Sequence, residues 1–239
     1  MARAMTEDRH RSGAPWRNFH GRIHGKTLNR RQQDLLRTDL AGLSPGPVGW
    51  EENPDRRPLD LAARFPQARA VWVEIGFGGG EHLVAMAARY PEVAIIGAEP
   101  YVNGVAQLLS KIRAAGVTNL AVHPGDVRDL FDVIPDASIA KAFLNYPDPW
   151  PKARHHKRRF VTPGYLAPLC RILMDGAEFR VATDIPDYVR QTLEEVPPAG
   201  FTHVDHPIDA PWPDWPSTRY EQKALREGRA PHYLTFRKR

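Results

Sequence analysis

The sequence lacks the features of membrane proteins and of disulfide-stabilised proteins. No stretch approaches about 18 uninterrupted apolar residues, so no membrane span is expected, and the N-terminus has no apolar run like those of secretory signals. The single cysteine, Cys170, cannot form an internal disulfide and lies in an apolar run typical of a buried helix. The arginine-rich N-terminus has the alternative of a mitochondrial transit peptide, but Glu7, Asp8 and the lack of an apolar helical stripe argue against it. We therefore expect a cytoplasmic protein.

Metal-binding and phosphate-binding motifs are missing as well. The histidines form no H-E-x-x-H motif and no cluster with the single cysteine. Gly25-Lys26-Thr27 faintly resembles the end of a P-loop. That motif needs four residues between its glycines, whereas Gly21 and Gly25 enclose three and no predicted strand precedes them. We predict that the protein uses no metal and has no P-loop.

What is present is an ordinary globular composition with an uneven distribution of charge. Apolar residues make up 42% and charged residues 26% of a 239-residue chain, which is long enough for one domain with a short extension. Residues 1–33, 152–159 and 219–239 together carry 20 Lys and Arg against four Asp and Glu, whereas the rest carries 13 against 24. Each basic segment alone could be a solvated face. Three of them beside an acidic body favour a surface that binds nucleic acid.

The chain divides into a basic N-terminal extension and a longer alternating region. Residues 1–27 show no periodicity and are predicted to form a mobile basic arm. Leucines recurring over 28–43 indicate a helix, and prolines over 44–58 indicate a loop. We therefore predict a basic N-terminal arm and helix over 1–45 and one domain over 46–239.

From residue 70 onward, short apolar runs alternate with helical stretches. This alternation predicts an α/β fold with a doubly wound, mostly parallel seven-stranded sheet. Strands are expected at 71–75, 93–98, 120–123, 139–144 and 179–183, with closing strands at 201–206 and 233–236. Helices are expected at 81–90, 101–115, 126–133, 163–174 and 186–196. Ligands of such sheets bind beyond the carboxyl ends of the strands, where the motifs described next are found.

A glycine-rich turn between the first strand and the first helix is the first candidate site. It reads Glu74-Ile-Gly76-Phe-Gly78-Gly-Gly80-Glu81, and its glycines permit a tight turn close to a ligand. A dinucleotide-binding loop would have its third glycine where Glu81 stands, and the flanking carboxylates would repel a pyrophosphate. Carboxylates instead suit the sulfonium and ammonium groups of S-adenosylmethionine. The turn therefore favours S-adenosylmethionine over NAD.

Two more carboxylates follow successive strands. Glu99 ends the second predicted strand, at the place of an acid that binds ribose hydroxyls. Asp126 follows the third strand and could either contact the adenine amino group or cap the next helix. Together with the glycine turn, these two carboxylates predict the rim of a cofactor site.

A proline-rich loop with a polybasic tail follows the fourth predicted strand. It reads Asn145-Tyr-Pro-Asp148-Pro-Trp-Pro-Lys152-Ala-Arg154-His-His-Lys-Arg-Arg159. The three prolines predict a stiff, extended loop that holds Asp148 in place. The basic tail is suited to a phosphate backbone. Joined beside the glycine turn, the two halves indicate a catalytic loop that also holds nucleic acid.

These motifs resemble those of bacterial tRNA (guanine-N7-)-methyltransferases, a family of class I methyltransferases that use S-adenosylmethionine. The resemblance covers about residues 28–239. Four stretches carry it: Glu74–Gly80, Asn145–Arg159, Thr183-Asp184 and Thr218-Arg-Tyr-Glu221. The chain departs from the family pattern at Tyr146, Ala153 and Arg180, where Phe, Lys and His are common. The missing charge at residue 153 is expected to weaken RNA binding slightly.

The resemblance implies a Rossmann-like fold, S-adenosylmethionine as cofactor, and methylation of N7 of a guanosine in the variable loop of tRNA. It implies that the cofactor contacts Glu74, Gly76, Gly78, Gly80, Glu99, Asp126 and Asp148, of which Asp148 is also the catalytic candidate. It implies that substrate or RNA contacts Lys152, Arg154, His155, His156, Lys157, Arg158, Arg159, Asp184, Thr218, Arg219, Tyr220 and Glu221. Whether the protein is a monomer or a homodimer stays open.

The chemistry of guanine N7 sets the expected mechanism. N7 has an exposed lone pair and no proton, so its methylation needs no obligatory deprotonation. We expect catalysis mainly from placing N7 in line with the methyl group and sulfur, while Asp148 stabilises the cationic purine or orients it. The target base must be accessible, which implies local unstacking of the tRNA. Asp184 and Glu221 are candidate acceptors for guanine N–H groups, but Thr218-x-x-Glu221 also has the form of a helix capping box.

Two other functions compete with this interpretation. Asn145-Tyr-Pro-Asp148 loosely resembles the N-P-P-[YF] motif of amino-group methyltransferases, but the second adjacent proline is missing and a basic tail is present. A non-catalytic RNA-binding protein could retain the same fold, but it would not need the complete set of cofactor carboxylates. Methyl transfer to tRNA followed by nucleoside analysis would separate the three functions.

Overall fold

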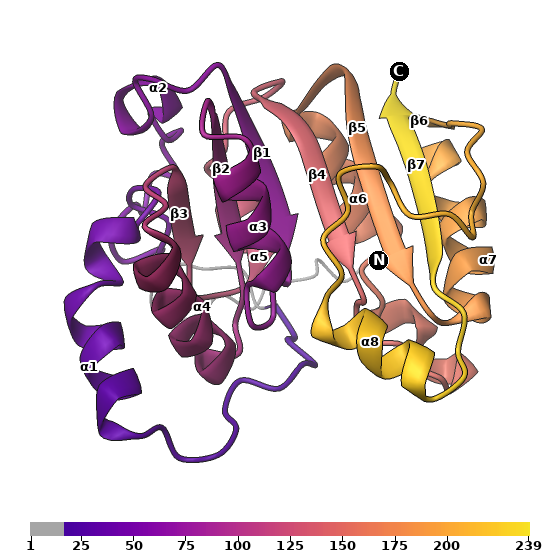
Figure 1. The fold of residues 1–239 in the computed structure, drawn as a ribbon. Helices are drawn as coiled ribbons and strands as arrows, with labels where there is room; N and C mark the ends of the chain where they lie inside the picture. Colours follow the sequence, from indigo (N-terminus) through magenta and orange to yellow (C-terminus); the bar gives the residue numbers. More distant parts are fainter. Residues whose placement is uncertain (1–16) are drawn as a thin grey trace, which may run out of the picture.

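One seven-stranded sheet organises the chain in a computed structural model that describes residues 17–239 (Figure 1). Residues 1–16, the first part of the predicted basic arm, lie outside the described residues. The strands are β1 Ala70–Ile75, β2 Val93–Ala98, β3 Leu120–His123, β4 Ile139–Asn145, β5 Leu173–Thr183, β6 Phe201–His203 and β7 His232–Lys238. Their order is β3-β2-β1-β4-β5-β7-β6, and only the pairs that include β7 are antiparallel within the described chain. The predicted doubly wound, mostly parallel sheet is confirmed.

Helices cover both faces of this sheet (Figure 1). They are α1 Arg30–Thr38, α2 Leu61–Arg64, α3 Glu81–Arg89, α4 Val102–Ala115, α5 Val127–Phe131, α6 Pro163–Ile172, α7 Pro186–Glu195 and α8 Arg219–Arg226, with short 3-10 helices at Ala41–Leu43, Ala153–Arg158 and Pro197–Ala199. Leu83 and Leu108 belong to the core on the α3 and α4 face, and Leu166 and Tyr188 belong to the core on the α6 and α7 face. Because both faces are covered, β2 is buried at every position.

The predicted elements differ from the observed ones mainly at their ends. β5 begins at Leu173 rather than at 179, because its register with β4 shifts between Ile139 and Lys141 and its exposed residues 174–176 interrupt the apolar pattern. Closing strand β6 ends at His203 rather than at 206. The short helix α2 lies within a stretch for which the sequence predicted no helix.

The N-terminal extension is packed against the rest of the chain. Residues 17–27 were predicted to form a mobile arm, yet Val102 N–H donates to the carbonyl of Ile23 at 2.9 Å and Gly25 N–H donates to Asn103 Oδ1 at 2.8 Å. Leu35 of α1 is 1% exposed and belongs to the core formed by α3 and α4. The predicted boundary at residue 45 therefore falls inside a packed body.

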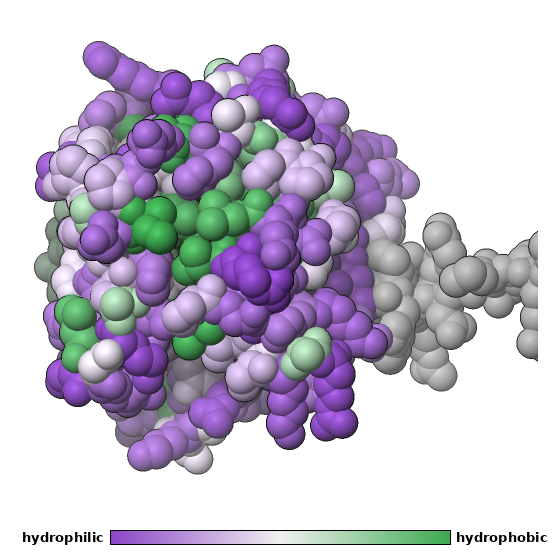
Figure 2. All heavy atoms as spheres, turned by 90° about the vertical axis from the view of Figure 1, so that its right-hand side faces the viewer, coloured by the Kyte–Doolittle hydropathy of each residue, from purple (hydrophilic) through white to green (hydrophobic). Residues whose placement is uncertain are grey.

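The side of the molecule that bears α7 and β6 has exposed apolar residues. Figure 2 shows a patch of apolar residues on that side, surrounded by hydrophilic ones. Leu193 of α7 and Ile208 are among the large apolar side chains that stay exposed in the structure. None of the helices within residues 17–239 combines the length and the apolar character needed to cross a bilayer.

Candidate active site

A pocket of about 610 Å³ opens at the carboxyl ends of β1, β2 and β4. Ligand pockets of small molecules typically have volumes of about 300–1,000 Å³, so a cofactor and part of a substrate can fit. Among the residues predicted to form the site, the lining includes Gly76, Gly78, Glu99, Asp126, Asp148, Arg158, Arg159, Arg219 and Tyr220. The structure thus brings residues from five separate segments to one edge of the sheet.

The glycine turn after β1 has a backbone that few other residues could adopt. Gly76, Gly78 and Gly80 have φ values of 67°, 56° and 76°, in the left-handed region that side chains with a Cβ disfavour. A Cβ at Gly104 of α4 would lie 2.2 Å from the carbonyl oxygen of Gly78, so α4 also packs directly against the turn. The turn therefore presents backbone groups, rather than side chains, to the pocket.

Glu99 holds the glycine turn while it faces the pocket. Its Oε2 accepts from Gly78 N–H at 2.7 Å and its Oε1 accepts from Tyr101 N–H at 2.9 Å. Burial raises the pKa of Glu99, and the two backbone hydrogen bonds oppose that rise. Each carboxylate oxygen has a second lone pair, so Glu99 can still accept hydrogen bonds from ribose hydroxyls.

Asp126 both caps a helix and lines the pocket, so it combines the two roles that its sequence position left open. Its Oδ1 accepts from Arg128 N–H at 2.9 Å, so it caps α5, and its Oδ2 pairs with the Arg128 guanidinium at 2.5 Å. Asp126 also lines the pocket. Capping and ligand contact are therefore compatible at this position.

Glu74 departs from the prediction of direct cofactor contact. It is 2% exposed and lies outside the pocket lining, with its Oε2 2.8 Å from His82 Nδ1 and its Oε1 accepting from Asn145 Nδ2 at 3.5 Å. These contacts join β1 to α3 and β4, directly behind the turn. Gly80 is also outside the lining, since it packs against Leu108. Both residues support the turn instead of lining the pocket.

The Asp148 loop, which follows β4, also lines the pocket. Pro147, Asp148 and Trp150 belong to the lining. Tyr146 and Trp150 have φ values of 49° and 41°, uncommon for residues other than glycine, so the loop bends sharply on both sides of Asp148. Burial raises the pKa of Asp148 above its ordinary value.

The start of α8 covers the glycine turn. Arg219 Nη1 donates to Gln107 Oε1 of α4 at 2.8 Å, and the Tyr220 ring lies so close to Gly78 that a Cβ there would be 3.1 Å from it. Thr218 caps the helix by accepting from Glu221 N–H at 3.2 Å. The segment that resembles the family's closing motif is therefore placed over the glycine turn.

The two predicted guanine acceptors lie outside the pocket lining. Glu221 is 5% exposed, and its Oε1 accepts from Trp215 Nε1 at 2.9 Å and from the Tyr233 hydroxyl. Asp184 accepts from Arg229 Nε at 2.5 Å. Thr218 makes the capping contact that the sequence predicted. The Glu221 carboxylate, in contrast, accepts these hydrogen bonds from the side chains of Trp215 and Tyr233.

The polybasic tail divides into an exposed part and one buried residue. Lys152, Arg154 and Lys157 are exposed, and His155, His156 and Arg158 are half-buried. Arg159 adjoins the pocket, but its side chain is 0% exposed and donates to Pro149 and Gln191 inside the protein, contrary to the prediction that it contacts phosphate. We call residues 152–158 the basic lip.

The N-terminal extension supplies a part of the pocket that no sequence pattern indicated. Phe19, His20, Gly21 and Arg22 line the pocket, in a segment without periodicity. The signal that could have located them is the spacing of Asp129 and Asp132, which places two acids on one face of α5.

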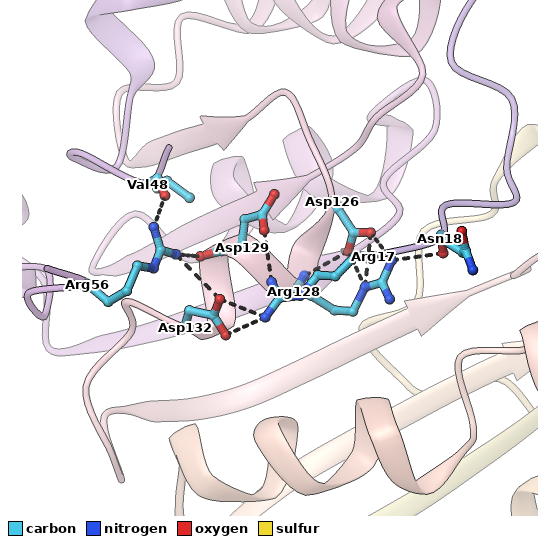
Figure 3. Close-up of polar contacts among 8 residues, drawn as sticks. All are labelled: Arg17, Asn18, Val48, Arg56, Asp126, Arg128, Asp129 and Asp132. Atoms are coloured by element: carbon cyan, nitrogen blue, oxygen red, sulfur yellow. Dashed lines mark hydrogen bonds and ion pairs between the residues drawn. The ribbon is translucent and has the colours of Figure 1, made fainter. Parts of the chain in front are cut away.

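An ion-pair network holds this extension next to Asp126. Arg17 pairs with Asp129 at 2.8 Å and with Asp132 at 2.7 Å, and Arg128 Nη2 donates to the carbonyl of Asn18 at 3.1 Å (Figure 3). Arg128 is the same residue that pairs with Asp126. The network therefore connects the extension to the rim of the pocket.

The sheet order and the pocket beyond its carboxyl edge define a Rossmann-like methyltransferase. A 16S rRNA methyltransferase, KamB, has the same fold with a TM-score of 0.56 at 15% identity, over 77% of this chain and 95% of that one. Residues 68–234 match a family model described as "Putative methyltransferase".

Sequence comparison identifies the family within this class. A tRNA (guanine-N(7)-)-methyltransferase from Paracoccus denitrificans is 68% identical over 225 residues, which cover 94% of this chain and 96% of that protein. One from Cereibacter sphaeroides is 70% identical over 226 residues, covering 95% and 93%. The chain belongs to the tRNA (guanine-N7-)-methyltransferase family, and its cofactor is S-adenosylmethionine.

Proposed function

We propose that the protein transfers the methyl group of S-adenosylmethionine to N7 of a guanosine in the variable loop of tRNA, in the cytoplasm. One observation carries the proposal: a single pocket joins the carboxylates after β2 and β3 to Asp148 and to the start of α8, beside the basic lip. The names of the relatives support tRNA as the substrate.

The residues of the pocket fit the cofactor. Glu99 would hold the ribose, Asp126 would lie at the adenine, and the backbone of the glycine turn would lie along the remainder. When bound, S-adenosylmethionine supplies an electrophilic methyl group on a sulfonium. The described lining carries carboxylates at Glu99, Asp126 and Asp148, which suit this cation electrostatically.

Asp148 would act on the purine side of the reaction. Guanine N7 needs no deprotonation, and positive charge develops on the base as the methyl group arrives. Asp148 lines the pocket, and desolvation raises its pKa. A carboxylate that is partly desolvated there would interact more strongly with that charge than one in water, because the local dielectric is lower. We assign Asp148 to electrostatic stabilisation or orientation of the base rather than to proton removal.

The basic lip and the start of α8 would hold the RNA around the target. Lys152, Arg154 and Lys157 are exposed in the segment that follows the Asp148 loop and can reach phosphates. Tyr220 lines the pocket and is 42% exposed, so its ring can stack on a base that has left the helix. Glu221, held by Trp215 and Tyr233, stays a proposed acceptor for guanine.

The proposal is tested by methyl transfer to bulk tRNA from cells that lack their own 7-methylguanosine. The reaction uses S-adenosylmethionine with a labelled methyl group, and the digested tRNA is separated into nucleosides. We expect the label in 7-methylguanosine. Label in another nucleoside would assign a different methylation, and tRNA binding without any transfer would indicate a non-catalytic RNA-binding protein.

A further inference from the structure

Arg159 is the last residue of the polybasic run, but its guanidinium lies beneath the Asp148 loop. Its Nε donates to the carbonyl of Pro149 at 2.8 Å, and its Nη2 donates to the carbonyl of Trp150 at 3.4 Å. These two carbonyls belong to the residues that directly follow Asp148. The side chain therefore holds the backbone of the loop from inside.

The other side of the same guanidinium is fixed to α7. Its Nη1 donates to Gln191 Oε1 at 3.0 Å and lies 2.9 Å from Asp187 Oδ2. The guanidinium carbon lies 5.2 Å from the centre of the Tyr188 ring, and Tyr188 is itself fully buried. One planar group with five N–H donors thus connects the loop to a helix that is packed in the core.

The loop needs such an external support. Pro147, Pro149 and Pro151 have no backbone N–H, so they cannot donate the hydrogen bonds that hold most loops. Trp150 has a φ of 41°, a conformation that persists only where surrounding contacts enforce it. The two carbonyls that Arg159 binds belong to these same residues.

We propose that Arg159 is a positioning residue, which keeps the Asp148 loop in its catalytic geometry, and that it is not a phosphate contact. The proposal rests on the proposed function, because it gives Asp148 a role in methyl transfer. The proposal assigns different roles to two arginines of one motif. Arg154 is exposed and can contact RNA, whereas Arg159 is buried and supports the loop.

Arg159→Lys and Arg159→Gln test this proposal, with Arg154→Gln as the matched control. Arg159→Lys keeps the charge but loses the planar guanidinium whose N–H groups bind both the Asp148 loop and α7. We therefore expect the single-turnover rate with saturating tRNA and cofactor to fall about tenfold or more. The melting temperature of each variant is measured alongside to separate this effect from unfolding. An unchanged rate would overturn the proposal.

The dependence of tRNA affinity on salt distinguishes positioning from phosphate contact. Each lost phosphate contact flattens the slope of log affinity against log salt by roughly 0.7–0.9. We expect Arg154→Gln to flatten the slope by about this amount, whereas Arg159→Gln leaves it unchanged. Flattening by Arg159→Gln equal to that of Arg154→Gln would assign Arg159 to RNA and overturn the proposal.

Hydrogen exchange of the protein alone tests the support without any methyl transfer. We expect the amide of Trp150 and those of residues 152–155 to exchange faster in Arg159→Lys than in the wild type. If Arg159 variants do not fold, Gln191→Met removes one acceptor of the guanidinium on α7 and should speed the same exchange less. Unchanged exchange would refute the support even if the wild type methylates tRNA. Faster exchange in Arg159→Lys, together with a wild type that methylates no tRNA, would refute only the proposed function.

Discussion

The two ends of the pocket are held by different kinds of contact. At the cofactor end, Asp126 binds a backbone N–H two positions away, and Glu99 binds one 21 positions away in the neighbouring turn. At the substrate end, Arg219 reaches Gln107 over 112 positions and Arg159 reaches Gln191 over 32. The cofactor end is therefore set by where strands end, whereas the substrate end depends on side chains that connect distant segments.

This contrast implies that substitutions at the two ends should fail differently. A change at Glu99 alters groups that face the cofactor and should leave the Asp148 loop in place. A change in the supports of the loop or of α8 should lower the rate without weakening the cofactor to the same extent.

Asp148→Ala should have the largest effect. Removing a preorganised group that faces the charge developing in a transition state typically costs about 10²–10³-fold in rate, and we expect a single-turnover rate at least about 100-fold lower. The residue lies on a loop outside the apolar core, so the variant should fold. Thermal melting serves as the control. A rate close to wild type with saturating tRNA would remove Asp148 from the mechanism.

The pH dependence of the rate sharpens this assignment. Burial raises the pKa of Asp148, and the ionised form is the active one. The rate should therefore fall as the pH decreases through the pKa of Asp148, which lies above the ordinary value for aspartate, and it should reach its plateau on the alkaline side. Asp148→Asn should lack this acidic limb in its residual rate. A limb of the same shape in the variant would assign it to another group, such as Glu99.

Glu99→Ala tests the cofactor end. The substitution removes both the proposed ribose acceptor and the partner of Gly78 N–H, and hydrogen bonds to charged groups contribute about 1.5–3 kcal/mol each. We expect cofactor affinity, measured by calorimetry, to fall at least about tenfold. Affinity for tRNA should change little by comparison. An unchanged cofactor affinity would place the ribose elsewhere.

The sequence predicted the cofactor end more fully than the substrate end. Parallel strands end at one edge, so apolar runs and the residues that follow them suffice to bring Glu99 and Asp126 to one pocket. The glycine spacing likewise matches a turn in which Gly76 and Gly78 have positive φ. Such features depend on residues that are close to one another in the sequence.

Side-chain direction could not be predicted from the same patterns. Arg159 stands in a run of basic residues, and only the acceptors on α7 show that it turns inward. The position of Glu74 near the end of β1 predicted that it faces the pocket. Its carboxylate instead contacts His82, eight positions later on α3. The contribution of residues 19–22 depends on ion pairs between Arg17 and α5, more than 100 positions away.

Glu221→Gln tests whether the substrate end reads guanine. If Glu221 accepts guanine N–H groups, the amide presents a donor to a donor, and kcat/KM should fall at least about tenfold, which corresponds to about 1.4 kcal/mol. Tyr233→Phe is the matched control, since it removes a donor to the same carboxylate and keeps the charge. It should lower kcat/KM less. A near-normal value in Glu221→Gln would leave Glu221 as a structural residue between Trp215 and Tyr233.

Arg17→Ala should have the smallest effect and tests whether the extension belongs to the cofactor end. Arg17 pairs with Asp129 and Asp132, and all three side chains are partly exposed, at 23%, 33% and 25%, so the pairs contribute modestly. Because residues 19–22 line the pocket, loosening Arg17 should speed cofactor release about threefold, in stopped-flow measurements at low salt. High salt should reduce the difference from wild type. The control is Arg37→Ala, which removes a surface pair on α1 between residues 78% and 47% exposed and should leave release unchanged. Equal release rates for Arg17→Ala and wild type at low salt would show that the extension does not retain the cofactor.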